Sequence, residues 1–366
     1  MIYNKEEQKI LLNLIEEKQE EKIIHNLKMV IKNIPDNDNE GDLDPRVKNS
    51  LVETAKAMAG MPKSEQPKSA QDIPVDFIRS TMGHVNFDIS NGIETINKTI
   101  QGRNGDIPLE IYSSNKSEKM RTIVFIHGGA FFGGSTKTVK NACKYLAQKI
   151  EGVVVSVDYR LCPEHRFPEG LHDCFDTVKW LYENGKELNV NKDAIGVAGD
   201  SAGGNLSAVC ALMDRDMKTN MIKFQGLIYP VVMLSNKEVD DYKFDISLYN
   251  VKHNHELINN TIMMITSFPP LSLLYVNSDE EVDNPYVSPL LAENLKDVAE
   301  TLIVTAEYDY LTLEAETYGR KLVRDGVKTK VIRYNGIDHA FIDKFGIYPQ
   351  AQDFINEMAK AFLNAI

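Results

Sequence analysis

The stretch Ala194-Ile195-Gly196-Val197-Ala198-Gly199-Asp200-Ser201-Ala202-Gly203-Gly204 decides the fold. It begins with a short apolar run and leads into a helical pattern over 203–217. Strand, sharp turn and helix in this order are the context in which G-x-S-x-G forms a nucleophile elbow. Glycines flank Ser201 because neighbouring strands and helix approach too closely for a Cβ atom, and the backbone N–H of Ala202 then points toward whatever Ser201 attacks. We therefore predict a nucleophilic serine; the alternative is a Gly-rich turn with an incidental serine.

Short apolar runs recur on both sides of this motif, with helical patterns between most of them. Continuous β-branched runs of this length are typical of strands buried on both faces of a sheet. Strands that alternate with helices predict an α/β fold with a mostly parallel central sheet and helices on both faces. The predicted strands are 93–100, 107–112, 123–126, 153–157, 194–198, 226–232, 302–305 and 330–334, and the predicted helices are 138–150, 169–185, 203–217, 312–325 and 350–364.

One interval breaks this alternation. Between Val232 and Thr301 the chain runs nearly 70 residues without an obvious buried strand. That length is too great for a simple connection between a strand and a helix. We therefore predict an insertion that lies above the sheet.

The chain before residue 93 has a different texture. Residues 4–34 are rich in Glu, Lys, Ile and Leu, and an apolar residue recurs there at steps of three or four (Ile23, Leu27, Val30, Ile34). This spacing predicts one face of a helix that packs on the body, with a membrane-surface or partner helix as the alternative.

Further helices are predicted between this segment and the first strand. Asp44-Pro45 is typical of an N-cap followed by proline in the first turn, which predicts a helix over 45–59. Residues 60–75, rich in Pro, Lys, Ser and Gln, predict an exposed connection, and 76–92 one more short helix.

The composition of the 366 residues excludes several classes of protein. With 41 Lys and Arg against 53 Asp and Glu, the net charge is −12, so nucleic acid is disfavoured as a main partner. The four cysteines form no CxxC pair, which predicts neither a zinc site nor a disulfide scaffold. No apolar run approaches the ~18 residues that span a bilayer, and residues 1–9 do not resemble a signal peptide. We expect a cytoplasmic protein without stable membrane insertion.

A second motif, His127-Gly128-Gly129-Ala130-Phe131, follows the predicted strand 123–126. Small residues after a strand allow backbone N–H groups to face a cavity, where they can bind a developing oxyanion. We predict Gly128 and Gly129 as donors of an oxyanion hole together with Ala202, with a simple glycine turn as the alternative. His127 follows the wrong strand to act as the base, so we interpret it as structural, orienting the loop by hydrogen bonds. Asp200 is interpreted as an acceptor that fixes a loop.

These motifs together resemble the hormone-sensitive lipase family of α/β-hydrolase carboxylesterases, which shows H-G-G-[GA] followed by G-D-S-A-G-G. The tract Asp158-Tyr159-Arg160-Leu161-Cys162-Pro163-Glu164 with Phe167-Pro168, and the tract Asn284-Pro285-Tyr286-Val287-Ser288-Pro289, are also similar to family segments. The resemblance covers roughly residues 43–366 and implies an α/β-hydrolase fold with a helical cap.

The resemblance also implies the partners of Ser201. Asp309 matches the family's catalytic acid in a D-P-L-x-D-E segment, although Tyr310 and Leu313 replace the proline and the second aspartate. Glu307 is the fallback acid. His339, in Gly336-Ile337-Asp338-His339-Ala340-Phe341, matches the family's base. The chain order Ser201, Asp309, His339 is the order of α/β-hydrolases.

The expected function is hydrolysis of short- to medium-chain acyl esters through an acyl-enzyme on Ser201, by a serine carboxylesterase that needs no cofactor or metal. The alternatives are an amidase, lactonase or thioesterase on the same triad, or a non-catalytic small-molecule receptor of this fold. The expected partner is a small-molecule ester, and a homodimer is possible.

Four regions are expected from the resemblance. They are an N-terminal helical extension with part of the cap (1–92), a first part of the core (93–232), a cap insertion (233–285) and a second part of the core (286–366). The family normally begins near residue 41, so residues 1–40 are an addition, which we expect to lie over the cap or the body or to join a dimer.

Overall fold

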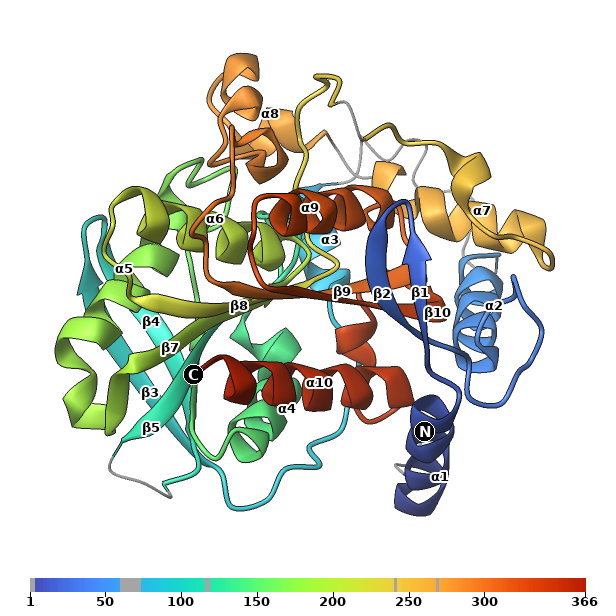
Figure 1. Ribbon diagram of the computed structural model, residues 1–366, viewed down its shortest axis with the longest axis horizontal. Coiled ribbons are helices and arrows are strands. Elements are labelled where there is room, and N and C mark those ends of the chain that lie inside the picture. The colour runs from blue at the N-terminus through green and yellow to red at the C-terminus, as the bar shows by residue number, and fades with distance from the viewer. Residues whose placement is uncertain (1–3, 60–73, 116–118, 240–241, 268–269) are drawn as a thin grey trace.

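A ten-stranded sheet runs through the centre of the protein in a computed structural model that describes residues 4–59, 74–115, 119–239, 242–267 and 270–366 (Figure 1). The strand order is β1-β2-β10-β9-β8-β7-β5-β6-β4-β3. The strands are β1 (Glu20–Ile24), β2 (Leu27–Lys32), β3 (Glu94–Gly102), β4 (Gly105–Ser113), β5 (Met120–Ile126), β6 (Val153–Val157), β7 (Val190–Asp200), β8 (Ile222–Ile228), β9 (Glu300–Tyr308) and β10 (Thr329–Asp338).

Neighbouring strands from β2 to β6 in this order are parallel, and the outer strands β1, β4 and β3 pair in the antiparallel sense. The mostly parallel sheet is therefore confirmed. Every residue of β6 is buried, and β5 is buried except for Arg121, as expected for strands covered on both faces. All eight strands predicted from residue 93 onward are found, although β8 begins at Ile222 rather than at 226.

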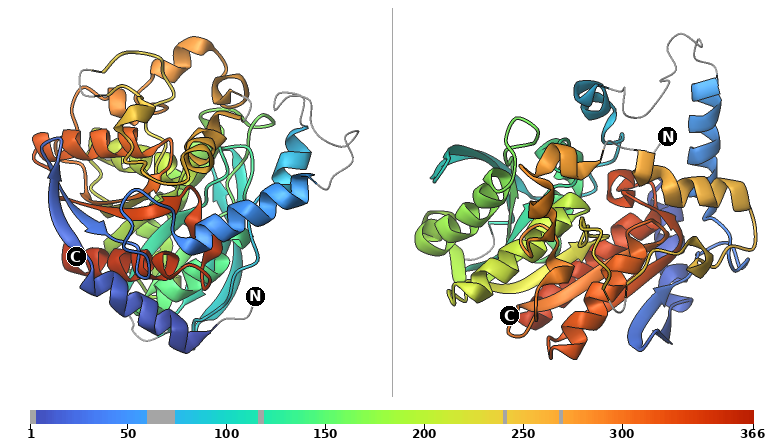
Figure 2. Two further views of the ribbon diagram at one scale, coloured as in Figure 1. Left: turned by 90° about the vertical axis from the view of Figure 1, so that its right-hand side faces the viewer. Right: turned by 90° about the horizontal axis from the view of Figure 1, so that it is seen from above.

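Helices cover both faces of the sheet (Figures 1 and 2). α4 and α10 pack together on one face, and α5, α6 and α9 lie on the other. The helices are α1 (Lys5–Glu17), α2 (Pro45–Ala59), α3 (Val75–Thr81), α4 (Thr136–Lys149), α5 (Glu169–Asn184), α6 (Ala202–Asp216), α7 (His255–Met263), α8 (Leu271–Tyr275), α9 (Thr312–Arg324) and α10 (Pro349–Ala365). Short 3₁₀ helices span Gly185–Leu188, Ile246–Leu248, Met264–Ser267, Asp279–Asp283, Pro289–Leu291 and Phe341–Lys344.

The long interval between β8 and β9 leaves the sheet, as predicted. Its helices α7 and α8 lie at the upper right and top of Figure 1, outside the layers of the core. The chain before residue 93 touches this interval, because the N–H groups of Lys252 and His253 donate to the carbonyl of Gly41 at 2.9 and 3.1 Å. Asp44 caps α2 through a hydrogen bond from the Arg46 N–H (2.9 Å), as its sequence predicts. Most of the predicted connection 60–75 lies outside the described residues.

The helix predicted over residues 23–34 is wrong. The chain instead turns at His25 and Asn26, both at positive φ (48° and 64°), and forms the antiparallel hairpin β1–β2. Two consecutive residues at positive φ form the tight hairpin turn that matches the twist of the strands. β2 then pairs in parallel with β10, with Val30 opposite Ile332, so the N-terminal addition extends the core sheet. Within the described part of this addition, residues 4–40, only α1 is an α-helix.

Candidate active site

Ser201 occupies the turn between β7 and α6. Its backbone has φ 54° and ψ −116°, a region that costs a non-glycine residue about 1–3 kcal/mol. Three backbone bonds fix this conformation: the Ser201 N–H donates to the Ile228 carbonyl (2.9 Å), and the Ser201 carbonyl accepts the N–H groups of Asn205 (3.1 Å) and Val231 (3.2 Å). The turn is therefore the sharp elbow that the sequence motif predicts.

The glycines of the motif are required by close backbone contacts. A Cβ atom at Gly203 would lie 2.0 Å from the Ile126 carbonyl oxygen and 2.5 Å from that of His127. A Cβ atom at Gly199 would lie 2.4 Å from the Gly203 carbonyl oxygen. Since these neighbours are backbone atoms, they cannot move aside as a flexible side chain could.

The structure brings the three side chains of the predicted triad together. The Ser201 Oγ lies 3.0 Å from His339 Nε2, and His339 Nδ1 lies 2.7 Å from Asp309 Oδ2. They come from the same end of three parallel strands: Ser201 follows β7, Asp309 follows β9 and His339 follows β10, with β8 between β7 and β9 in the sheet. The hydroxyl is thus within proton-transfer distance of an imidazole whose other nitrogen is held by a carboxylate.

Nearby carboxyl groups set the protonation of His339. Burial acts to lower the pKa of His339, but the charge and hydrogen bond of Asp309, together with the charges of Asp200 and Asp338, outweigh burial and raise the pKa above its usual value. Burial also raises the pKa of Asp338 to about 6 and that of Asp343 to about 7. The raised pKa of His339 favours its imidazolium form.

The acid itself is held by a tight turn. Asp309 Oδ1 accepts the Leu311 N–H (3.0 Å), and its carbonyl accepts the Thr312 N–H (3.1 Å). The fallback acid Glu307 lies elsewhere: its Oε2 accepts the Gly336 N–H (2.8 Å), and its side chain lines a cleft of 680 Å³ beneath the N-terminal addition. Its burial raises its pKa to about 7.

The loop after β5 is tied to the elbow by Asp200. The Gly128 N–H donates to Asp200 Oδ1 at 2.8 Å, so Asp200 fixes the loop as predicted. The same bond corrects the predicted oxyanion hole, because the Gly128 N–H is already occupied. Among the described residues, the N–H groups of Gly129, Ala130 and Ala202 have no such partner. Of these three residues, Ala130 is the one that the sequence motifs did not indicate.

His127 contacts the oxyanion loop and Tyr159 through its buried ring, which agrees with its predicted structural role. It is fully buried, its Nδ1 lies 2.7 Å from the Gly128 carbonyl, and its ring stacks on Tyr159 with centroids 4.4 Å apart. Burial lowers its pKa to about 4, which keeps the ring neutral. The Tyr159 hydroxyl in turn donates to the His127 carbonyl (2.9 Å).

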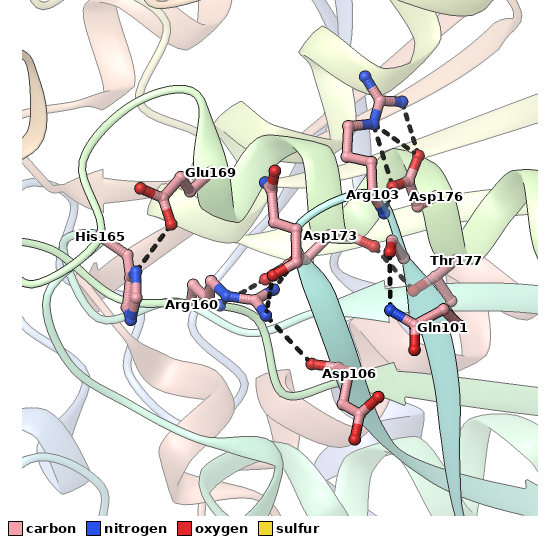
Figure 3. A network of polar contacts seen from close by, with 11 residues as sticks. Gln101, Arg103, Asp106, Arg160, His165, Glu169, Asp173, Asp176 and Thr177 are labelled. Carbon is pink, nitrogen blue, oxygen red and sulfur yellow. Dashed lines mark hydrogen bonds and ion pairs between the residues drawn. The ribbon is translucent and has the colours of Figure 1, made fainter.

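The tract around Tyr159 is fixed by an arginine. Figure 3 shows Arg160 between Asp173 of α5 and the carbonyl of Asp106 on the β3–β4 hairpin. Arg160 Nη1 lies 2.5 Å from Asp173 Oδ1, and the Arg160 N–H donates to the other carboxylate oxygen (3.0 Å). This tract therefore supports the oxyanion loop from outside the site and adds no reacting group.

The described residues contain no group of three or more His, Cys, Asp and Glu side chains arranged to hold a metal ion. All four cysteines are buried free thiols. Across the same described ranges, no helix is long and apolar enough to span a bilayer.

Comparisons with known proteins agree with the fold and the site. Residues 123–343 match a family of the alpha/beta hydrolase fold. An arylesterase of Saccharolobus solfataricus is 35% identical over 258 residues, which cover 68% of this chain and 77% of that protein. Carboxylesterase NlhH of Mycobacterium tuberculosis is 31% identical over 252 residues, 68% of this chain and 75% of that protein. The structure of a hyperthermophilic esterase from Pyrobaculum calidifontis is 30% identical with a TM-score of 0.72, covering 88% of this chain and 98% of the esterase.

The matched region contains the elbow, the oxyanion loop and all three residues of the hydrogen-bonded triad. The fold and the family that the motifs imply are thereby confirmed. The chain belongs to the hormone-sensitive lipase type of α/β hydrolase.

Proposed function

We propose that this protein is a serine carboxylesterase that hydrolyses small acyl esters through an acyl-enzyme on Ser201. The observation that carries the proposal is the continuous set of hydrogen bonds from Ser201 through His339 to Asp309, at 3.0 and 2.7 Å. Its relatives support ester bonds as the target, because those compared above carry the names arylesterase, carboxylesterase and esterase.

The chemistry follows from this geometry. His339 takes the proton of the Ser201 hydroxyl as the oxygen attacks the ester carbonyl, and Asp309 stabilises the imidazolium that forms. His339 then donates its proton to the leaving alcohol, so the acyl group remains on Ser201. Water, deprotonated by His339, releases the acid in the second half of the cycle. The raised pKa of His339 favours the imidazolium that protonates the leaving group.

The tetrahedral oxyanion needs donors that are not already engaged. We assign this role to the N–H groups of Gly129, Ala130 and Ala202. Ala130 takes the place of Gly128 as a donor, because the Gly128 N–H bonds to Asp200. Ala202 is the first residue of α6, where backbone N–H groups have no partner within the helix and the helix dipole favours negative charge.

Short- to medium-chain esters are the proposed substrates. The segment 233–285 is rich in apolar residues, a composition that suits a dry pocket for an acyl or alcohol group. A homodimer stays a prediction.

A panel of p-nitrophenyl esters with graded acyl chains tests the proposal, with a matched anilide to measure amidase activity. Ser201→Ala should lower kcat by about 10⁴–10⁶. Ser207→Ala is the matched control, because the Ser207 hydroxyl lies on α6 and bonds to the Gly203 carbonyl (2.8 Å) rather than to the triad. A Ser201→Ala variant with more than a tenth of the wild-type rate, or faster cleavage of the anilide than of the ester, contradicts the proposal. A fluorophosphonate that labels wild type and not Ser201→Ala identifies the nucleophile independently.

A further inference from the structure

The turn that carries Asp309 has Tyr310 where the family segment has proline. The Thr312 N–H donates to the Asp309 carbonyl (3.1 Å), and Leu311 has φ −78° and ψ −7°, so residues 309–312 form a type I turn. Tyr310 holds the second position of that turn, where the family segment has proline. Proline is favoured there because its ring fixes φ near −65° before folding. This chain lacks that local constraint.

The segment between β8 and β9 contacts the turn at the same place. The Tyr249 hydroxyl lies 2.9 Å from the Asp309 carbonyl oxygen and 3.3 Å from that of Tyr310, so its single proton is shared between the two acceptors. Phe244 of the same segment stacks on Tyr310, with ring centroids 4.1 Å apart and planes 21° apart. Tyr249 is 9% exposed, and burial raises the pKa of its hydroxyl, which therefore keeps the proton it donates.

We propose that Tyr249 is a positioning residue for the catalytic acid: its hydroxyl fixes the turn that a proline fixes in related enzymes, so the cap insertion holds Asp309 against His339. The inference rests on the proposed function, because it gives Asp309 the role of the acid. It adds a dependence of the triad on a side chain that lies 60 residues before Asp309.

A small displacement of this turn has a direct effect on the reaction. Asp309 Oδ2 lies 2.7 Å from His339 Nδ1. The other carboxylate oxygen, Oδ1, accepts the Leu311 N–H of the same turn. Misplacement of a catalytic group by about 1 Å can cost 10²-fold in rate. Loss of one neutral hydrogen bond is a smaller perturbation, so we expect Tyr249→Phe to lower kcat by about 5- to 10-fold and to change KM less than about twofold.

The test compares Tyr249→Phe with a matched variant. Tyr308→Phe removes a hydroxyl that joins the same two parts of the chain, since it donates to the Asn250 carbonyl (3.0 Å) and not to a carbonyl of the Asp309 turn. Both variants are titrated with a phosphonate inhibitor so that kcat is given per active site. Only Tyr249→Phe should lower kcat. The acid limb of its kcat/KM profile should also move to lower pH, because a less well-placed Asp309 raises the pKa of His339 less.

A second substitution supplies the rescue. Since the family shows proline at this position, adding Tyr310→Pro to Tyr249→Phe should restore at least half of the lost kcat. The inference is overturned if Tyr249→Phe keeps the wild-type kcat and pH profile, if Tyr308→Phe loses as much as Tyr249→Phe, or if the proline restores nothing in a double variant with the wild-type melting temperature. These failures differ from failure of the proposed function, in which Ser201→Ala and Asp309→Asn would retain activity.

Discussion

The carboxylate of Asp200 accepts the backbone N–H of Gly128 at 2.8 Å, so the residue before the nucleophile holds the oxyanion loop in place. The two motifs that the sequence shows 72 residues apart are thereby one structural unit. A Cβ atom at Gly128 would lie 2.4 Å from Asp200 Oδ2, which explains why this contact requires glycine.

Removal of this contact should slow catalysis without removing any reacting group. A hydrogen bond to a charged group contributes about 1.5–3 kcal/mol, so Asp200→Ala should lower kcat by about 10- to 100-fold. Asp200→Asn keeps an acceptor oxygen and should stay within about threefold of wild type. Steady-state kinetics on a short-chain p-nitrophenyl ester measure both. Equal kcat for Asp200→Ala and wild type would show that the loop is held by other contacts.

The same carboxyl predicts how stability depends on pH. Burial raises the pKa of Asp200 to about 6, against 3.8 for an ordinary aspartate, although the Gly128 N–H opposes this. The folded state therefore binds this proton more tightly than the unfolded state, and the contribution to stability is full below pH ~3.8 and is lost as the pH rises through ~6. In thermal unfolding, the melting temperature of Asp200→Asn minus that of wild type should increase from pH 4.5 to pH 8, because only wild type loses this contribution. A constant difference across that range contradicts the assignment.

The acid limb of the pH–rate profile should identify the catalytic acid. His339 acts as a base when neutral, so kcat/KM rises with pH through its pKa, which Asp309 raises above the usual value against the effect of burial. Asp309→Asn should lower kcat by about 10⁴ and move this limb to lower pH. Glu307→Gln is the control, because Glu307 bonds to Gly336 and not to His339. Loss of activity in Glu307→Gln with activity retained in Asp309→Asn would reverse the two roles.

The elbow should not tolerate a methyl group. Gly203→Ala places a Cβ atom 2.0 Å from a backbone oxygen, and we expect loss of more than about 3 kcal/mol of stability or failure to fold. Gly319→Ala is the matched helical control, because its Cβ would meet only side-chain atoms at 3.1 Å or more and alanine favours the helix. Urea denaturation of both variants measures the difference. Similar midpoints would mean that the elbow relaxes around the methyl group.

The core of the fold was predictable because most of its strands are short apolar runs separated by helical patterns, and β5–β10 follow that rule. The hairpin β1–β2 was not, because the spacing of Ile23, Leu27 and Val30 also fits a helix. Leu27, Met29 and Ile31 alternate as buried residues on one face of β2, and the turn at His25-Asn26 was the signal that could have found it.

The triad was predictable because each member stands in a short motif beside a predicted strand end. Two other features of the site depend on contacts between distant segments, and the partners in these contacts have no local signal. The bond of the Gly128 N–H to Asp200 removes a predicted oxyanion donor, and the hydroxyl of Tyr249 reaches the Asp309 turn from the insertion.

The N-terminal hairpin should stabilise the fold through one buried lysine. The side chain of Lys32 on β2 is fully buried and lies within 3.2–3.3 Å of the carboxylates of Glu16, Asp353 and Glu357. Two of these acids belong to α10, so the charge of Lys32 joins the added hairpin to the last helix of the core.

Replacement of Lys32 by methionine keeps an apolar chain of similar length and removes the charge that the α10 carboxylates share. Breaking a buried ion pair on one side costs about 3–5 kcal/mol, because the partner charges stay buried. Glu357 keeps a second cation, Lys330, at 2.5 Å, so we expect Lys32→Met to lower the free energy of unfolding in urea by about 3 kcal/mol, the lower end of that range. Lys28→Met is the control on the same strand, because Lys28 and its partner Glu21 are 66% and 63% exposed and such pairs contribute about 0–1 kcal/mol. Equal stabilities of the two variants would show that the hairpin is held by its backbone pairing with β10 alone, and the N-terminal addition would then be an edge strand without an electrostatic anchor.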